Sequence, residues 1–422
     1  MKEHFYLLGS FLLLLFNTLS LYAQSTEEFK IFSKSGQVSS NQEVVRLPLE
    51  IWNDMILIHL KINGHPSTFL WDTGFTVSGI DQTLVKEYGL KPFGTKDNSV
   101  TLLDGNNQTT TGQFAIADLM EINTIQIKET PFIIFDSKAL TMTESIRLHG
   151  VLGGSVINQL NWNFNFDENY VEVSQKPFEI TENFFKLPFV IDDHQLHYMP
   201  ITFYDIPTYA QIDFGSNADE IEINLQNASI FSRAKATKIL GLKTVSVTGV
   251  APIDTAFTIK DQYHWTLGGQ TLNQLPRLNF GKTNRDLVLG NRIFRDHYNL
   301  IIQTSAEKVY ALSPRQKPSA STTDKEFGYF VLKMDQKLKI VQIIPNDNTV
   351  KYGLNLMDEI LELNGNTADN FKDNYSIIKL QRDLQKANKA LHLKLKNGNI
   401  IELMIQSPQP FEFKNNLELW NL

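Results

Sequence analysis

Two aspartates, Asp72 and Asp213, each end a run of apolar residues and begin a turn that contains glycine. Two carboxylates within hydrogen-bond distance cannot both ionise cheaply, so one of them keeps a proton. The charged member can take a proton from a bound water, while the protonated member polarises a peptide carbonyl. Such a pair, if the fold brings it together, can direct the attack of a water with no metal and no covalent intermediate.

The residues around each aspartate suit such a site. Gly74 supplies the backbone freedom that a tight turn needs, and the hydroxyl of Thr73 can bond nearby backbone groups. After Asp213, Gly215 occupies the place of Gly74, and Ser216 occupies the place of Phe75. A triplet such as Asp-Thr-Gly is also common in ordinary turns, so the motif needs structural context.

That context is a repeat along the chain. A segment of apolar residues and glycine, Gly150–Gly153, ends 81 residues after Asp72, and its counterpart Leu287–Gly290 ends 77 residues after Asp213. A Leu-Pro pair also precedes each aspartate, with the proline 24 residues before the first and 25 before the second. Recurrence at long fixed intervals predicts two duplicated lobes.

With these motifs the chain resembles the bacterial two-lobed aspartyl proteases of the retropepsin or pepsin-like type, over roughly residues 44–314. The resemblance implies that each lobe brings one aspartate to a shared cleft, above its apolar-glycine segment. Two residues depart from the pattern. Phe214 replaces the Thr or Ser that braces the second loop, and Phe75 stands where a small residue is usual and would narrow the cleft. Two interpretations stay open: an aspartic endopeptidase, or a degenerate fold that binds peptides without cutting them.

Composition excludes several other classes. The 422 residues carry a net charge of −7 without a basic run, which argues against nucleic-acid binding. Cysteine is absent, so disulfides, thiolate nucleophiles and cysteine metal sites are excluded. The histidines show no zinc spacing. We expect no cofactor, no metal and a peptide or unfolded protein as substrate.

Residues 1–24 have the pattern of an export signal, with Lys2 before an apolar core and Ala23 as a small residue for cleavage. An uncleaved membrane anchor is the alternative, but polar Asn17, Thr18 and Ser20 shorten the core. We expect an exported, periplasmic or secreted protein with no membrane span after cleavage.

Few segments have a helical period, so the expected fold is mainly β. The resemblance implies two pseudo-symmetric β-barrel lobes, followed by a smaller α+β domain. A monomer is expected, because both aspartates lie in one chain. The expected divisions are a flexible leader (25–43), a first lobe (44–182), a second lobe (183–314), a linker (315–324), an α+β domain (325–407) and a tail (408–422). Expected local elements are a strand over 55–62, hairpins over 101–107 and 244–250, and short helices over 81–88, 155–160 and 292–297.

Residues 325–407 resemble a PDZ domain. Phe327, Gly328, Tyr329 and Phe330 lie where that family binds a peptide carboxylate, and the later signature carries Met357 where a glycine is usual. The resemblance implies that a peptide adds as a strand at a sheet edge. A packing domain without a free groove is the alternative. A helix is expected over 371–384 and a hairpin over 391–404, while the tail could dock on the body or fill the groove.

Overall fold

The computed structural model describes residues 27–93, 100–103, 109–136, 146–203, 206–218, 220–224, 236–242, 245–246, 249–250, 254–259, 265–272, 277–281, 285–305, 307–318 and 325–411. The predicted export signal lies outside these residues, as do the centres of both predicted hairpins and most of the tail. In the described part of the chain, no helix has the length and apolar character to cross a membrane.

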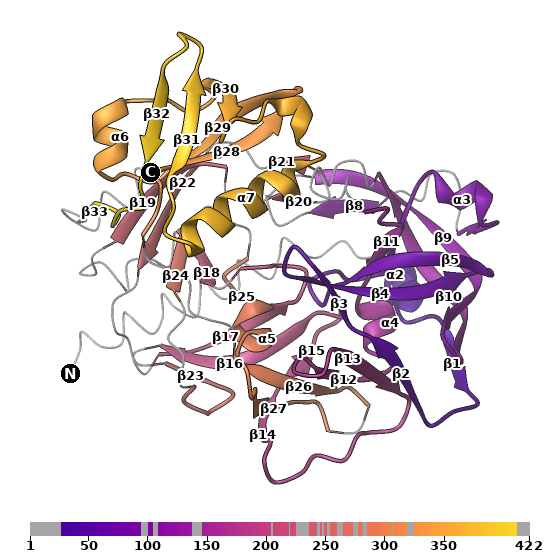
Figure 1. Cartoon of the computed structure of the whole chain (residues 1–422). Helices are drawn as coiled ribbons and strands as arrows, with labels where there is room; N and C mark the ends of the chain where they lie inside the picture. Colours follow the sequence, from indigo (N-terminus) through magenta and orange to yellow (C-terminus); the bar gives the residue numbers. More distant parts are fainter. Residues whose placement is uncertain are drawn as a thin grey trace, which may run out of the picture.

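The first lobe is built almost entirely of strands (Figure 1). Its elements are β2 (Val44–Pro48), β3 (Glu50–Trp52), β4 (Met55–Ile62), β5 (His65–Trp71), β6 (Gly79–Asp81), α3 (Leu84–Glu87), β7 (Lys91–Pro92), β8 (Val100–Leu103), β9 (Thr109–Ile122), β10 (Ile125–Phe135), β11 (Gly150–Leu152), α4 (Gly154–Ile157), β12 (Asn161–Asn165) and β13 (Tyr170–Ser174).

The strand predicted over residues 55–62 is confirmed as β4. Asn63 and Gly64, with φ of 48° and 84°, turn it into β5, as expected of a two-residue hairpin. β8 pairs with β9, as the first predicted hairpin requires, and the centre of that hairpin lies outside the described residues. Burial alternates only over the second half of β4, from Ile58 to Ile62, and the last three residues of β5 are all buried, so this hairpin delivers the end of β5 into the core.

The prediction of a flexible leader over 25–43 was wrong for most of its described part. Residues Glu27–Ser33 form α2, and Gln37–Ser40 form β1, which pairs with β10. Phe32 is buried, with its ring 4.6 Å from Phe93 and 4.7 Å from Phe114. Burial of these aromatic rings outweighs the polar composition of the segment.

The second lobe repeats the strand plan of the first. Its elements are β14 (Phe185–Pro188), β15 (Val190–Ile191), β16 (His197–Phe203), β17 (Ile206–Asp213), β18 (Glu220–Asn224), β19 (Ala236–Gly241), β20 (Val245–Ser246), β21 (Gly249–Val250), β22 (Asp254–Ile259), β23 (Trp265–Leu267), β24 (Arg277–Gly281), β25 (Leu287–Gly290), α5 (Arg292–Arg295), β26 (Tyr298–Gln303) and β27 (Val309–Pro314). β20 pairs with β21, as the second predicted hairpin requires.

The lobes are joined by one six-stranded sheet, which the predicted division into two separate lobes did not anticipate. Its order is β14-β27-β26-β12-β13-β2, with three strands from each lobe, and β12 pairs with β26 across the boundary. These strands lie together at the bottom of Figure 1. The two lobes therefore share a rigid base, and their main hydrophobic cluster is continuous.

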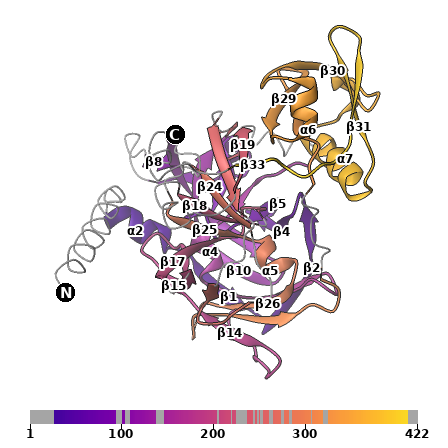
Figure 2. The ribbon, with the colours of Figure 1, turned by 90° about the vertical axis from the view of Figure 1, so that its left-hand side faces the viewer.

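The C-terminal unit (residues 325–411) has its own hydrophobic core and stands out from the body in Figure 2. The helix and hairpin predicted in it are both present. Its elements are β28 (Tyr329–Met334), β29 (Lys337–Ile343), α6 (Asp347–Tyr352), β30 (Glu359–Leu363), η3 (Ala368–Asn370), α7 (Asn374–Lys386), β31 (Leu391–Leu395), β32 (Ile400–Leu403) and β33 (Pro410–Phe411). Met357 adopts a φ of 69°, the left-handed conformation that a glycine would take without strain.

This unit is attached to the second lobe through strand pairing. β29 pairs with β19, and Gly241 lies so close to Val341 that a Cβ would stand 2.1 Å from its carbonyl oxygen. Phe411 of the tail packs 5.2 Å from Phe257, while β33 pairs with β19. The described start of the tail therefore docks on the second lobe.

A buried histidine makes the fold sensitive to acid. His197 contacts the Tyr310 hydroxyl through Nδ1 at 2.6 Å and Asn158 Oδ1 through Nε2 at 2.5 Å. Burial lowers the pKa of His197 to about 3. As the pH falls below about 6.5, His197 therefore binds a proton in the unfolded chain but not in the folded protein. We expect this difference to lower the free energy of unfolding by roughly 3 kcal/mol between pH 7 and pH 4.

Urea unfolding at several pH values measures this loss. His197→Gln should show a flatter decline below pH 6.5, because the titrating group is gone, whereas His194→Gln on the neighbouring surface turn should follow the wild-type curve. A decline of equal slope in all three proteins would contradict the assignment.

Candidate functional site

Asp72 is presented at the carboxyl end of β5. β11 runs parallel to β5 with Leu152 opposite Trp71, and the Asp72 amide donates to the Leu152 carbonyl at 3.0 Å. The carboxylate turns back onto its own loop, where Oδ1 accepts from the Gly74 amide at 2.7 Å. The first apolar-glycine segment thus holds the aspartate turn, as predicted.

Asp213 is presented in the same way in the second lobe. β25 runs parallel to β17 and places Gly290 opposite Asp213. The Asn291 amide donates to the Ser216 carbonyl at 2.9 Å, and the Ser216 amide donates to Asp213 Oδ1 at 3.0 Å. The internal repeat in the sequence therefore corresponds to a repeated strand arrangement around each aspartate.

The structure brings the two aspartates together. Their side chains are hydrogen-bonded to one another, and Asp72 Oδ1 also accepts from the Gly215 amide of the opposite lobe at 3.1 Å. Asp213 is buried, whereas Asp72 is partly exposed to solvent. This is the paired-carboxylate geometry that acid-base catalysis requires.

Gly74 and Gly215 are needed for space, a different reason from the one that the sequence suggested. Neither has a positive φ. A Cβ on Gly74 would stand 2.5 Å from the carboxylate of Asp213, and one on Gly215 would stand 2.2 Å from Oδ2 of Asp72. Each glycine therefore makes room for the aspartate of the other lobe.

Thr73 joins the two loops. Its hydroxyl donates to the Ile212 carbonyl at 2.7 Å and accepts from the Phe214 amide at 3.1 Å. Thr73 is fully buried, so both bonds are shielded from water. This half of the predicted bracing is present. Ser216 contributes its amide to Asp213, as described above.

Phe214 fills the place where a second bracing hydroxyl was expected. Its fully buried ring lies 5.1 Å from Trp71, nearly perpendicular to it, and stacks 5.7 Å from Phe294. The contact with Trp71 therefore joins the two lobes at the position where the hydroxyl is missing. Phe75 is partly buried on the first lobe, 6.3 Å from Phe135.

Phe214→Thr is expected to destabilise the fold by about 3 kcal/mol, because it removes a buried ring and leaves a cavity. Urea unfolding at pH 7 measures the change. Phe214→Leu keeps most of the apolar volume and should cost less than half as much. Equal stability of Phe214→Thr and wild type would show that the ring packing is unimportant.

Arg285 is a site residue that the sequence analysis missed. It precedes β25, and its Nη1 bonds Asp213 Oδ2 at 2.5 Å while Nη2 lies 3.7 Å from Glu222. The side chain is 18% exposed, so this ion pair is mostly shielded from water. Arg285 therefore places a positive charge directly against Asp213. The only signal in the sequence is a cation beside the second apolar-glycine segment.

The environment makes the two aspartates unequal. Burial and the neighbouring charge of Asp213 raise the pKa of Asp72 well above its ordinary value, despite opposing contributions from the Gly74 amide and Arg285. Asp213 has an arginine as its direct partner, whereas Asp72 has backbone amides. The arrangement therefore favours a proton on Asp72.

The predicted peptide-binding residues of the C-terminal unit lie beside the edge of β28, and side chains of α7 already bond the backbone of that edge. Phe327 and Tyr329 are buried, and Gly328 has a φ of 91°. On β28, the amide and carbonyl of Val331 bond the Gln381 side chain of α7 at 3.0 and 2.9 Å. Asn374 makes the same two contacts with Lys333, at 2.6 and 3.1 Å.

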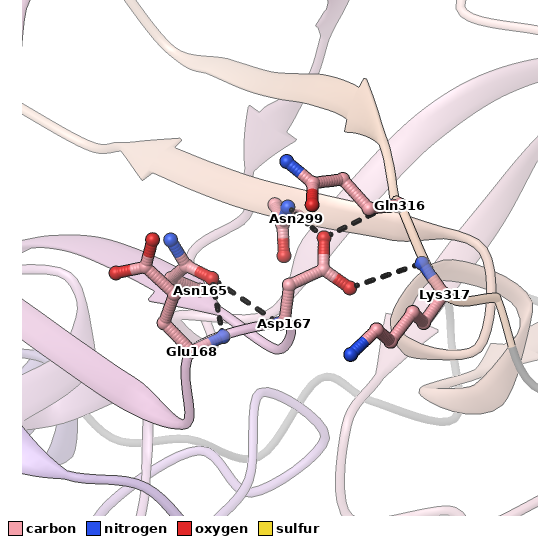
Figure 3. Close-up of a pocket in the computed structure, with 6 residues that line it drawn as sticks. All are labelled: Asn165, Asp167, Glu168, Asn299, Gln316 and Lys317. Carbon is pink, nitrogen blue, oxygen red and sulfur yellow. Dashed lines mark hydrogen bonds between the residues drawn. The ribbon is translucent and has the colours of Figure 1, made fainter.

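A cavity of about 120 Å³ lies away from the aspartate pair (Figure 3). Asp167 at its centre accepts from Asn299 at 2.9 Å and from the Gln316 amide at 2.9 Å. Asp167 also accepts from Arg315 Nε at 3.2 Å and from the Lys317 amide at 3.4 Å. These contacts hold the chain as it leaves the second lobe, which indicates an anchoring role for the cavity wall.

Comparison with known proteins agrees with part of this description. Residues 58–156, from β4 into α4, match the family model described as aspartyl protease; the match contains Asp72 but not Asp213. The crystal structure of basic 7S globulin from soybean is similar at a TM-score of 0.38 and 11% identity, covering 64% of this chain and 95% of that chain. No curated protein matches the chain.

Proposed function

We propose that this protein is an aspartic endopeptidase. The observation that carries the proposal is the hydrogen-bonded pair of Asp72 and Asp213, delivered by two matching strand arrangements and braced by Thr73. The aspartyl protease match over residues 58–156 supports it independently for the first lobe.

The unequal environments suggest a role for each aspartate. Asp213, charged beside Arg285, accepts a proton from the attacking water. Asp72, protonated, donates a hydrogen bond to the peptide carbonyl and stabilises the charge that develops on its oxygen. Water then adds directly to the carbonyl carbon, and the proton held by the pair passes to the leaving amine.

The second candidate is a peptide-binding or scaffold protein without activity, and Phe214 and Phe75 are the residues that favour it. Activity decides between the two. If wild-type protein already cuts at a rate that Phe214→Thr scarcely improves, the degenerate interpretation fails.

For the C-terminal unit, peptide recruitment through residues 327–330 remains a prediction. The four hydrogen bonds from Gln381 and Asn374 favour the alternative of a packing domain, because a peptide strand could add to β28 only after α7 moves. Export likewise stays a prediction, since it rests on residues 1–24.

The test is incubation of purified protein with an unfolded polypeptide, followed by mass spectrometry of the products. Hydroxylamine and a metal chelator are added in parallel samples. We expect fragments with free carboxyl ends, unchanged rates with the chelator and no hydroxamates, because direct water attack leaves no acyl-enzyme to trap. Hydroxamate products or loss of cleavage with the chelator would contradict the proposed mechanism.

A further inference from the structure

The turn between β3 and β4 is the point at which all three parts of the molecule meet. Asn53 and Asp54 form it, and both have positive φ, 47° and 65°. This conformation belongs to a tight two-residue hairpin turn. The turn lies in the first lobe, but its polar groups bond residues of the second lobe and of the C-terminal unit.

The backbone of the turn is bonded to the loop that carries Asp213. Asn217, four residues after Asp213, donates to the Asn53 carbonyl at 3.0 Å. The buried Asn291 side chain donates to the Asp54 carbonyl at 2.9 Å and to the Phe214 carbonyl at 3.0 Å. One amide thus links the turn to the residue next to Asp213.

The carboxylate of Asp54 is held between two arginines from different parts of the chain. Arg295 of α5 bonds Oδ1 at 2.9 Å and the Asp54 carbonyl at 2.6 Å. Arg382 of α7 bonds Oδ2 at 3.0 Å. A ring contact of 5.1 Å between Trp52 and Tyr375 lies on the same side of α7.

Neighbouring arginines stabilise the negative charge of Asp54. Burial raises the pKa of this carboxyl group, but the positive charges of Arg295, Arg292 and Arg382 outweigh that effect and hold the pKa below its ordinary value. Asp54 is therefore an anion near neutral pH, and it can attract both guanidinium groups at once.

We propose that Asp54 is a positioning residue for the Asp213 loop, and that Arg382 makes this positioning depend on the docked C-terminal unit. The proposal rests on the proposed peptidase function. Displacement of a catalytic group by about 1 Å is enough to cost up to 10²-fold in rate, so a brace beside the loop should affect turnover more than substrate binding.

The first test compares Arg382→Ala with Lys379→Ala, which removes an exposed ion pair to Asp383 on the same helix. Arg382→Ala should lower kcat about threefold to tenfold with KM unchanged within about twofold, while Lys379→Ala keeps wild-type values. Asp54→Asn should lower kcat by at least as much. The double variant of Asp54→Asn and Arg382→Ala should match Asp54→Asn alone, because both changes break one linkage.

Hydrogen exchange provides a readout that does not need activity. The amides of Gly215, Ser216 and Asn291 bond within the site, and they should exchange about tenfold faster in Arg382→Ala than in Lys379→Ala. If wild-type protein hydrolyses nothing, the peptidase proposal fails and exchange alone decides. Equal exchange in the two variants, or kcat effects that multiply in the double variant, would overturn the positioning role.

Discussion

Asp72→Asn is expected to lower the rate of peptide hydrolysis by about 10²–10⁴-fold while leaving the fold nearly as stable as wild type at pH 7. The rate falls while the stability is kept, because burial and the charge of Asp213 favour the neutral form of Asp72, and asparagine is also neutral. The variant loses the proton that Asp72 shares with its partner but disturbs little packing.

Asp213→Asn should lower the rate as much, and it should also destabilise the protein. The substitution removes the direct partner of Arg285, so a mostly shielded cation loses one of its two carboxylates. Initial rates on an unfolded polypeptide and urea unfolding measure both quantities. Asp193→Asn, at an exposed ion pair with Lys30, serves as the control and should change neither. Cleavage that survives substitution of both Asp72 and Asp213 would rule out the mechanism.

Arg285→Met is the second change with a large expected effect. It leaves Asp213 and Glu222 without the guanidinium that lies between them, and breaking a buried ion pair on one side costs about 3–5 kcal/mol. This loss of stability should be smaller at acid pH, because protonation removes the negative charge that Arg285→Met leaves unpaired. Urea unfolding at pH 7 and pH 4 measures it.

The same substitution should change the pH dependence of hydrolysis. Arg285 lowers the pKa of Asp72, so its removal raises that pKa further and moves the alkaline limb of the kcat/KM profile, where Asp72 loses its proton, to higher pH. Arg285→Lys keeps the charge but loses the planar fork, and it should lie between wild type and Arg285→Met in both measurements. An unshifted profile in Arg285→Met would show that the arginine does not act on the aspartate pair.

The sequence by itself was enough to locate the aspartate pair. Apolar strands that end at Asp72 and Asp213, with matching apolar-glycine segments downstream, predicted the strands that deliver both carboxylates. Strand periodicity and turn residues are local properties, so they can be read along the chain. The same reasoning predicted the Thr73 brace and the hairpin of the C-terminal unit.

Tertiary structure decided what surrounds the pair. Arg285, Asp54 and Arg382 carry no local signal, because their roles depend on which distant residue they meet. The pairing of β12 with β26 likewise joins strands that are far apart in the chain. Aromatic contacts hold α2 in place, although the polar composition of its segment had predicted a flexible leader. Long-range contacts of this kind follow from how whole surfaces pack, which no short stretch of residues encodes.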